Sequence, residues 1–393
     1  MNKKTVIITA PSLDPTQNVS GVSSVVQFII ANNKEMDYIH FQIGKTDKES
    51  GGILQRLRRI WKCYGEWRTL LFSTAYETQS KIATKTKRHS VTTKTIVHYS
   101  FPLSAPSILR DPWFMHYALK KGYKMVVHVH GGLFLTTPKI PWLLKRILKR
   151  VFSWNVTFIV LSEGEKKILK EKFGAKRVEV LPNCPDVPKV NETHQWCYET
   201  SLKRLRNASS ARYENKNLTL GYLGRIEPNK GMEELLGALE RCKTEGRRFM
   251  VRFAGKEEKE GEYLPRYKEK LGNDFEYCGL VSGKEKEDFL SSLDVFVMPT
   301  YFEGLPMSLL ETMSYGAVPV VTKVGSIPTV VRNDENGLFI ELKDVDSIVD
   351  ALKRLDNDRT LLVRLSENAR KTIRENFSAE RYVEKLNEIY GSL

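Results

Sequence analysis

Residues 295–311 read VFVMPTYFEGLPMSLLE and join a short apolar run to the start of a helix. Residues 295–298 have the length and composition of a buried strand, and Gly304 permits a tight turn after it. Pro306 lies where a first helical residue tolerates the loss of its N–H, so we expect a helix to begin there. A strand, a turn and a helix in this order are typical of an α/β protein with a parallel sheet.

The same pattern recurs along the 393 residues. Short runs rich in Val and Ile, each followed by a turn and an amphipathic stretch, predict strands that alternate with helices. In the first half we expect strands at residues 5–9, 95–98, 125–130, 156–161 and 178–181. In the second half we expect strands at residues 218–223, 249–254, 275–278, 295–298 and 318–321.

The length favours two domains, because 393 residues exceed what one ordinary hydrophobic core accommodates. We expect a Rossmann-like domain over residues 1–190 and a second one over 218–375. The polar residues 191–217 between them lack hydrophobic periodicity and are interpreted as a connection, with one helix near 198–206. A helix over residues 376–393 is expected to pack back toward the first domain. Because such sheets bind ligands on the loops after their strands, the ligand site is expected in a cleft between the domains.

Composition favours a cytoplasmic protein. No segment reaches the roughly 18–20 consecutive apolar residues that a membrane-spanning helix needs. The first apolar run is short and ends at Pro11, which indicates a strand rather than a signal peptide. The five cysteines are scattered without the spacing of metal ligands, which favours reduced thiols.

Positive charge is concentrated in the first half of the chain. Residues 1–190 carry 31 Lys/Arg and 13 Asp/Glu, and residues 51–150 alone carry 19 Lys/Arg and 3 Asp/Glu. Two stretches, 54–72 and 141–152, combine cations with apolar residues at helical spacing and suit an anionic membrane surface. Their cations include Arg56, Arg58, Arg59, Lys145, Arg146, Lys149 and Arg150. The plainer interpretation is that each apolar stripe packs on the sheet and that the cations are only solvated.

Residues 303–311 predict a site for a diphosphate. The N–H groups of Met307 and Ser308 would point out of the helix N-terminus, which attracts anions. Glu303 on the loop and Glu311 in the helix would lie on either side of the phosphate, where carboxylates suit sugar hydroxyls. Taken alone, the two could also be a solvated loop residue and a residue that interacts with the helix dipole.

Residues 220–231 read LGYLGRIEPNKG and again join a strand, a glycine and a loop. Arg225 and Lys230 leave one strand end, where two cations can neutralise the charge that builds up on a departing nucleotide diphosphate. Arginine offers a fork to two phosphate oxygens, and lysine offers a point charge. Ordinary solvated loop cations are the alternative for this segment alone.

Together the two segments resemble the retaining glycosyltransferases of family 4, which have the GT-B fold of two facing Rossmann-like domains. The resemblance is strongest over residues 221–340 and rests on the 224–231 loop and on the spacing of Glu303 and Glu311. Residues 127–131, 180–183, 316–320 and 336–337 also match the family pattern. This sequence departs from it at Val22 and Ser326, where the family usually has glycine, and at Thr329, where an acidic residue is common.

The resemblance implies a hexosyltransferase that uses a nucleotide-diphosphate sugar. Arg225 and Lys230 would hold the donor diphosphate, Glu303 would meet the donor sugar, and Glu311 would meet the nucleotide ribose. The other residues expected at the donor are Gly21, Gly224, Gly304, Leu305, Pro306, Met307 and Ser308. His130 would approach the transferred sugar, although a structural role at the strand end is an alternative. We expect His128 to point to the other face of that strand, into the core.

No motif supplies a convincing nucleophilic carboxylate. We therefore expect attack on the same face of the sugar, with the leaving phosphate helping to deprotonate the acceptor. No metal cluster is visible in the sequence, and Arg225 with Lys230 could do the work of a divalent cation, so we expect no strict metal requirement. The basic half favours a lipid-linked saccharide acceptor in polysaccharide biosynthesis and a peripheral location on the inner face of the cytoplasmic membrane.

Three alternatives stay open at this point. The acceptor could be a soluble sugar or sugar phosphate. A sugar-nucleotide epimerase could share the fold, but the loop with Arg225 and Lys230 and the spaced Glu303 and Glu311 resemble the transferase. A nucleic-acid-binding protein is suggested by charge alone, lacks a recognisable zinc finger or RNA-binding aromatic motif, and leaves the two phosphate loops unexplained. The sugar, the base and the oligomeric state are not defined by the sequence.

Overall fold

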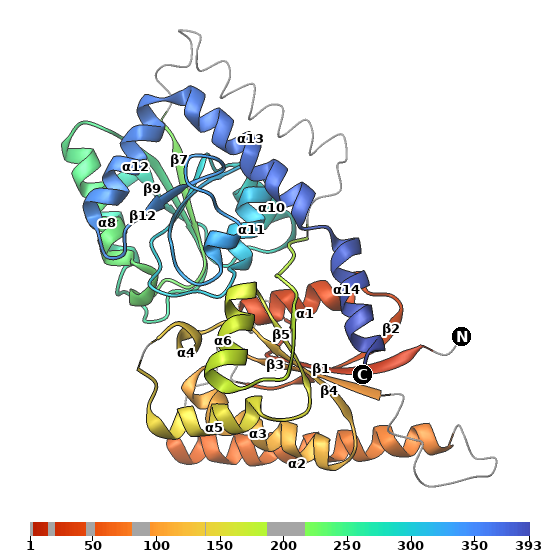
Figure 1. Ribbon diagram of the computed structural model, residues 1–393. Helices are drawn as coiled ribbons and strands as arrows, with labels where there is room; N and C mark the ends of the chain where they lie inside the picture. The colour runs from red at the N-terminus through yellow and green to blue at the C-terminus, as the bar shows by residue number, and fades with distance from the viewer. Residues whose placement is uncertain (1–2, 15–19, 45–51, 81–94, 138, 187–216) are drawn as a thin grey trace. The chain divides into compact units, whose positions relative to one another are not determined.

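The computed structural model describes residues 3–14, 20–44, 52–80, 95–137, 139–186 and 217–393. The chain divides into two compact units, one formed by Met1–Pro182 with Glu380–Leu393 and the other by Asn183–Ala379. Each unit is built on its own six-stranded sheet with flanking helices (Figure 1). The predicted α/β class with two Rossmann-like domains is confirmed. The connection expected at 191–217, with its helix near 198–206, lies outside the described residues except for Asn217.

The first sheet has the strand order β2-β1-β3-β4-β5-β6, and all its strands are parallel. Its strands are β1 (Lys4–Ala10), β2 (Met36–Gln42), β3 (Thr95–Phe101), β4 (Lys124–Val129), β5 (Thr157–Val160) and β6 (Arg177–Val180). The helices of this unit are α1 (Gly21–Asn32), α2 (Ile53–Ser80), α3 (Ala105–Lys120), α4 (Leu133–Thr136), α5 (Trp142–Phe152), α6 (Glu163–Phe173) and α14 (Ala379–Gly391). Five of the strands were predicted. The sixth, β2, is a half-exposed edge strand that carries Asp, His and Gln among its apolar residues.

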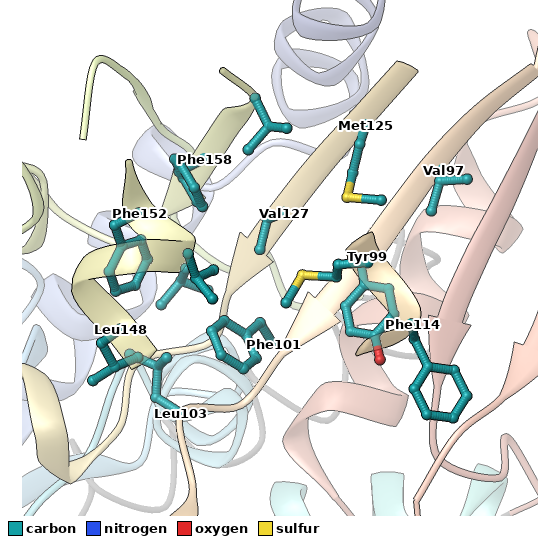
Figure 2. Close-up of a cluster of buried hydrophobic side chains, with 14 of the residues drawn as sticks. Val97, Tyr99, Phe101, Leu103, Phe114, Met125, Val127, Leu148, Phe152 and Phe158 are labelled. Carbon is teal, nitrogen blue, oxygen red and sulfur yellow. The ribbon is translucent and has the colours of Figure 1, made fainter. Parts of the chain in front are cut away.

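One face of the first sheet packs against α2, α3 and α5. Tyr99 and Phe101 of β3 lie in a single apolar cluster with Phe114 of α3 and Leu148 of α5 (Figure 2). Trp67 of α2 is fully buried in this cluster and donates its indole N–H to the carbonyl oxygen of Phe114 at 3.0 Å. The inner stripes of these helices therefore pack on the sheet, as the plainer interpretation of the two basic stretches requires.

The C-terminal helix α14 packs on the first unit. Tyr382 of α14 meets Phe28 of α1 edge to face, with ring centroids 5.2 Å apart. The Tyr390 hydroxyl lies 2.6 Å from His98 Nδ1 on β3. The side chain of Asn387 accepts a hydrogen bond from that of Asn33 at 2.7 Å. The end of the chain is therefore held to the first sheet by aromatic packing and by buried polar contacts.

Three histidines lie side by side at this sheet. His98 Nε2 lies 3.2 Å from His128 Nδ1, and the rings of His128 and His130 stack with centroids 4.1 Å apart. His128 is fully buried, as expected, but the expectation that it points away from His130 is wrong, because residues two apart in a strand share one face. Burial lowers the pKa of His98 and of His130 to about 3. Burial and the neighbouring imidazoles hold the pKa of His128 well below its usual value.

We predict that the protein loses stability as the pH falls below neutral. The unfolded chain binds protons at these histidines below about pH 6.5, whereas the depressed pKa values keep them neutral in the folded protein until much lower pH. Each histidine should then lower the free energy of unfolding by up to about 1.4 kcal/mol per pH unit. In thermal unfolding between pH 7.5 and 4.5, His128→Gln should show a smaller decrease in Tm than the wild type. His116→Gln, at an exposed position, is the control. Equal slopes for His128→Gln and the wild type would contradict the prediction.

The second sheet has the strand order β12-β11-β10-β7-β8-β9 and is also parallel. Its strands are β7 (Thr219–Leu223), β8 (Met250–Ala254), β9 (Phe275–Tyr277), β10 (Val295–Met298), β11 (Val318–Thr322) and β12 (Leu338–Ile340). Its α-helices are α8 (Met232–Thr244), α9 (Leu264–Leu271), α10 (Gly283–Ser291), α11 (Met307–Ser314), α12 (Val345–Asn357) and α13 (Arg359–Asn376). The three-residue edge strand β12 was not predicted. The strand order reverses between β7 and β10, and open α/β sheets bind ligands at such a switch point.

Candidate active site

The loops after β7 and β10 touch at the switch point. The backbone N–H of Tyr301 donates to the carbonyl oxygen of Asn229 at 2.9 Å, and the Thr300 hydroxyl donates to the same oxygen at 3.3 Å. Gly231 has a φ of +70°, and a Cβ atom there would lie 2.2 Å from the carbonyl oxygen of Pro299. Only glycine combines this backbone conformation with so close an approach. The two sequence motifs therefore form one site.

Two further loops meet the same site. A Cβ atom on Gly255, after β8, would lie 1.8 Å from the carbonyl oxygen of Gly224. A Cβ atom on Gly325, after β11, would lie 1.9 Å from the carbonyl oxygen of Glu303. The N–H of Ser326 donates to the carbonyl oxygen of Gly304 at 3.0 Å, and Ser326 is fully buried. The loop that carries Glu303 is therefore fixed by its backbone from the β11 side.

Lys230 and Glu303 form an ion pair between Nζ and Oε1. The two side chains are 16% and 18% exposed, so the pair is largely screened from solvent. The Thr300 hydroxyl lies 3.4 Å from the same carboxylate oxygen. A cation from one motif and a carboxylate from the other are thus brought together at the switch point.

Glu311 lies in the second turn of α11 and pairs with Lys286 of α10 at 2.8 Å. Its side chain is 13% exposed. Sequence reasoning missed Lys286, which stands in the charged run of α10, where nothing local distinguishes it from solvated neighbours. Its contact with Glu311 depends on the tertiary fold, since the two residues are 25 positions apart in the sequence.

Arg225 differs from Lys230 in that its side chain has no partner among the described residues. Its side chain is half-buried, and within the described ranges its guanidinium makes no hydrogen bond or ion pair. Its carbonyl oxygen accepts a hydrogen bond from the hydroxyl of Tyr222, a fully buried residue of β7. The backbone is therefore fixed, while the guanidinium is available to an anion.

The N-terminus of α11 has no side-chain cap. Pro306 is the N-cap residue, with φ −64° and ψ 129°, so the helix begins at Met307 and the expectation that Pro306 is the first helical residue is wrong by one position. The Leu305 carbonyl oxygen accepts a hydrogen bond at 2.7 Å from the side chain of Asn183, which is 5% exposed. Since no side chain in the described part of the chain caps this helix, Met307 and Ser308 can offer their N–H groups to an anion.

The remaining predicted site residues belong to the first unit. The N–H of His130 donates to the carbonyl oxygen of Phe101 at 3.3 Å, and neither ring nitrogen has a hydrogen-bond partner within the described part of the chain. Gly21 is the first residue of α1, whose N-cap Ser20 accepts from the N–H of Ser23 at 3.2 Å. The predicted cations Arg56, Arg58 and Arg59 lie on α2, and Lys145, Arg146, Lys149 and Arg150 lie on α5.

Among the described residues, no three His, Cys, Asp or Glu side chains are grouped so that they could hold a metal ion. Every helix formed by the described residues is too short or too polar to span a bilayer.

The fold is that of the GT-B glycosyltransferases. The structure matches sucrose-phosphate synthase from Thermosynechococcus elongatus with a TM-score of 0.71 and 14% identity over 99% of both chains. It matches Anabaena HepE in complex with UDP-glucose with a TM-score of 0.68 and 13% identity, over 99% of this chain and 100% of that one. These identities are low, so the likeness concerns the fold.

The sequence matches a known family over part of its length. Residues 204–372, which include Arg225, Lys230, Glu303 and Glu311, match the family described as glycosyl transferases group 1. Over 288 residues the chain is 26% identical to the Escherichia coli UDP-Gal:α-D-GlcNAc-diphosphoundecaprenol α-1,3-galactosyltransferase, which covers 68% of this chain and 69% of that enzyme. The matches of this chain to two further glycosyltransferases cover 47% and 52% of the lengths of those proteins. Residues 204–372 therefore form a domain of the group 1 glycosyltransferases, and the protein is an enzyme of the glycosyltransferase class.

We predict that Gly325→Ala displaces the loop that carries Glu303. The new Cβ atom would need the space that the Glu303 carbonyl oxygen occupies, at a φ of +55°. The variant should lose most of the increase in Tm that a bound nucleotide sugar gives. Gly246→Ala is the matched control, since Gly246 also has a positive φ, of +82°, but nothing lies within 4 Å of the added carbon. If both variants keep the full nucleotide-induced shift, Gly325 does not fix this loop.

Proposed function

We propose that the protein is a retaining glycosyltransferase that moves a hexose-type sugar from a UDP- or GDP-sugar to a lipid-linked saccharide in polysaccharide biosynthesis. The observation that carries this proposal is the meeting of Lys230 and Glu303 beside the uncapped start of α11. The E. coli relative is named for UDP-Gal and for a diphosphoundecaprenol-linked GlcNAc, and the Anabaena structure contains UDP-glucose. Those names support a UDP-sugar donor and a lipid-linked acceptor here.

In this proposal the donor diphosphate lies between the cations and the start of α11. Arg225 has no competing partner within the described ranges, and Lys230 is held by Glu303, so both cations are in place before the donor arrives. The N–H groups of Met307 and Ser308 complete the phosphate contacts, with Gly224, Gly304, Leu305 and Pro306 as the surrounding backbone. Fixed donors of this kind stabilise the charge that grows on the leaving phosphate without further rearrangement.

The two carboxylates would recognise the hydroxyls of the donor. Glu303 accepts hydrogen bonds from the hydroxyls of the transferred sugar once Lys230 also contacts the diphosphate. Lys286 contacts Oε1 of Glu311. Because an ionised carboxylate has two oxygens and about four acceptor positions, Glu311 can still accept from the ribose. In the same proposal His130, kept neutral by the burial that lowers its pKa to about 3, would approach the transferred sugar, and Gly21 would lie near the donor.

The reaction would keep the configuration of the sugar. The acceptor oxygen forms a bond to the anomeric carbon on the face from which the phosphate leaves, while the bond from that carbon to the phosphate oxygen breaks. The acceptor proton passes to the departing phosphate, and a nucleoside diphosphate is released. The protein contributes positioning and charge stabilisation, and we propose no strict metal requirement.

We predict that Arg225→Ala and Lys230→Ala each lower kcat by about 10²- to 10³-fold, because each removes a charge that acts on the leaving phosphate. Release of nucleoside diphosphate from the donor, with EDTA present throughout, is the measurement, and wild-type activity should survive EDTA. Arg248→Ala is the control, since this exposed arginine pairs with Asp274 at the start of β8 and β9. Loss of wild-type activity in EDTA would contradict the metal-free mechanism.

We predict that one nucleotide base is preferred and that Glu311 helps to hold the nucleotide. A hydrogen bond to a charged group contributes about 1.5–3 kcal/mol, so Glu311→Ala should bind the nucleotide roughly 10- to 100-fold more weakly. Thermal shifts with UDP, GDP, ADP and their common sugar conjugates would identify the base. Glu335→Ala, which changes an exposed carboxylate paired with Arg332, should behave like the wild type. No shift with any nucleotide, in folded protein, would contradict the donor site.

We propose that the acceptor is lipid-linked and that the enzyme works at the inner face of the cytoplasmic membrane. The cations on the outer sides of α2 and α5 support this location. A soluble sugar or sugar phosphate is the alternative acceptor, and sugar transfer that needs no lipid carrier would favour it. The basic first unit would then serve the acidic groups of a soluble acceptor.

A further inference from the structure

Three adjacent helices of the first unit carry large apolar side chains on their outer sides. Trp61 of α2, Trp113 of α3 and Trp142 of α5 are 72%, 71% and 74% exposed. Six further apolar residues on the same helices are 46–76% exposed: Ile53, Leu54, Leu57, Phe72, Leu109 and Leu143. We call these nine residues the tryptophan face. Single exposed apolar residues are ordinary, but a concentration of this kind marks an interaction surface.

The three helices form one side of the first unit. Tyr64 of α2 packs edge to face on Phe114 and Tyr117 of α3, with ring centroids 5.3 and 5.9 Å apart. Helix α3 also packs against α5, and Figure 1 shows α2, α3 and α5 together on one side of the sheet. Their inner residues belong to a single core. Their outer sides therefore turn away from the same face of the sheet.

Core packing does not account for the tryptophan face. Helix α5 already buries Leu144 and Leu148, and α2 buries Trp67 and Leu71. The exposed tryptophans lie outside these stripes. Trp113 is not in either basic stretch of the sequence, but its helix α3 lies between α2 and α5, which contain those stretches. It therefore joins two separate basic helices into one surface.

Charge decides which partner this face suits. Its outer cations include Arg58, Lys62 and Arg68 on α2 and Lys145, Arg146 and Lys149 on α5. Among the described side chains of α2, α3 and α5, Glu66 is the single exposed carboxylate, and it lies 3.9 Å from Lys62. Two copies of so basic a face would repel each other. Indole rings and cations together match the boundary between the headgroups and acyl chains of an anionic bilayer.

We propose that the tryptophan face inserts into the headgroup region of an anionic bilayer. Trp61, Trp113 and Trp142 then lie below the level of the lipid phosphates, and the lysines and arginines contact those phosphates. This deepens the proposed function, on which it rests for the lipid-linked acceptor. Insertion of the tryptophans adds an apolar contribution to the electrostatic attraction between the protein and the anionic lipids. Because salt screens exposed charges but not buried apolar area, part of the binding should survive high ionic strength.

The test uses the full chain and sedimentation with vesicles of phosphatidylcholine, with or without phosphatidylglycerol. The wild type should bind the vesicles with phosphatidylglycerol at about 0.1 M salt and keep part of that binding at about 1 M, where the Debye length is about 3 Å. The variant with Trp61→Ala, Trp113→Ala and Trp142→Ala should lose the salt-resistant part, with at least tenfold weaker binding at about 1 M salt. A variant with Met250→Ala and Leu342→Ala removes exposed apolar side chains from the second unit and should bind like the wild type.

Three outcomes would overturn the insertion. The wild type could leave the vesicles completely at high salt, the tryptophan variant could bind as well as the wild type, or the wild type could form a dimer in solution that the tryptophan variant abolishes. The nucleotide-induced thermal shift keeps this test separate from the proposed function. It should be unchanged in the tryptophan variant, which also shows that the variant folds. A wild type that binds vesicles without any nucleotide shift would contradict the donor site and leave the insertion standing.

Discussion

The pairing of β7 with β10 is the constraint on which the donor site depends. Phe296 pairs with Gly221 in parallel, so the two strands end at the same edge of the sheet. The Leu293 side chain packs against Gly221, where an added Cβ atom would lie 2.2 Å from Leu293 Cδ1, so a larger residue there would require that side chain to move. Lys230 and Glu303 are 73 residues apart in the sequence, and their ion pair forms because the strands before them are neighbours.

A largely buried ion pair is a poor source of stability, because removing both charges from water offsets much of their attraction. The pair of Lys230 and Glu303 is better understood as preparation for a ligand. It keeps an ammonium beside an uncapped helix N-terminus while the carboxylate compensates its charge. Arg225 has no such compensation within the described ranges. An incoming diphosphate can therefore bind Arg225 directly, and it can contact Lys230 while Lys230 remains paired with Glu303.

Sequence patterns predicted the strands and motifs that neighbouring residues define, and they missed contacts between segments that are far apart in the sequence. The central strands are mostly apolar and largely buried, and all of them were predicted. The edge strands β2 and β12 were missed because β2 is half-exposed and mixes polar with apolar residues, and β12 has three residues. The motif residues could be singled out because glycines, cations and carboxylates follow strand ends at short spacing. Lys286 and Asn183 carry no such signal, since their contacts with Glu311 and Leu305 come from packing between distant segments.

The chain passes between the two units at two places, near residues 182–183 and 379–380. Within the second unit these places are adjacent, since the sulfur of Cys184 lies 3.4 Å from the carbonyl oxygen of Phe377. Beyond the second crossing, α14 is held to the first sheet by Tyr382 and by the contact of Tyr390 with His98. The C-terminal helix therefore belongs to the first unit, although the segment that precedes it belongs to the second.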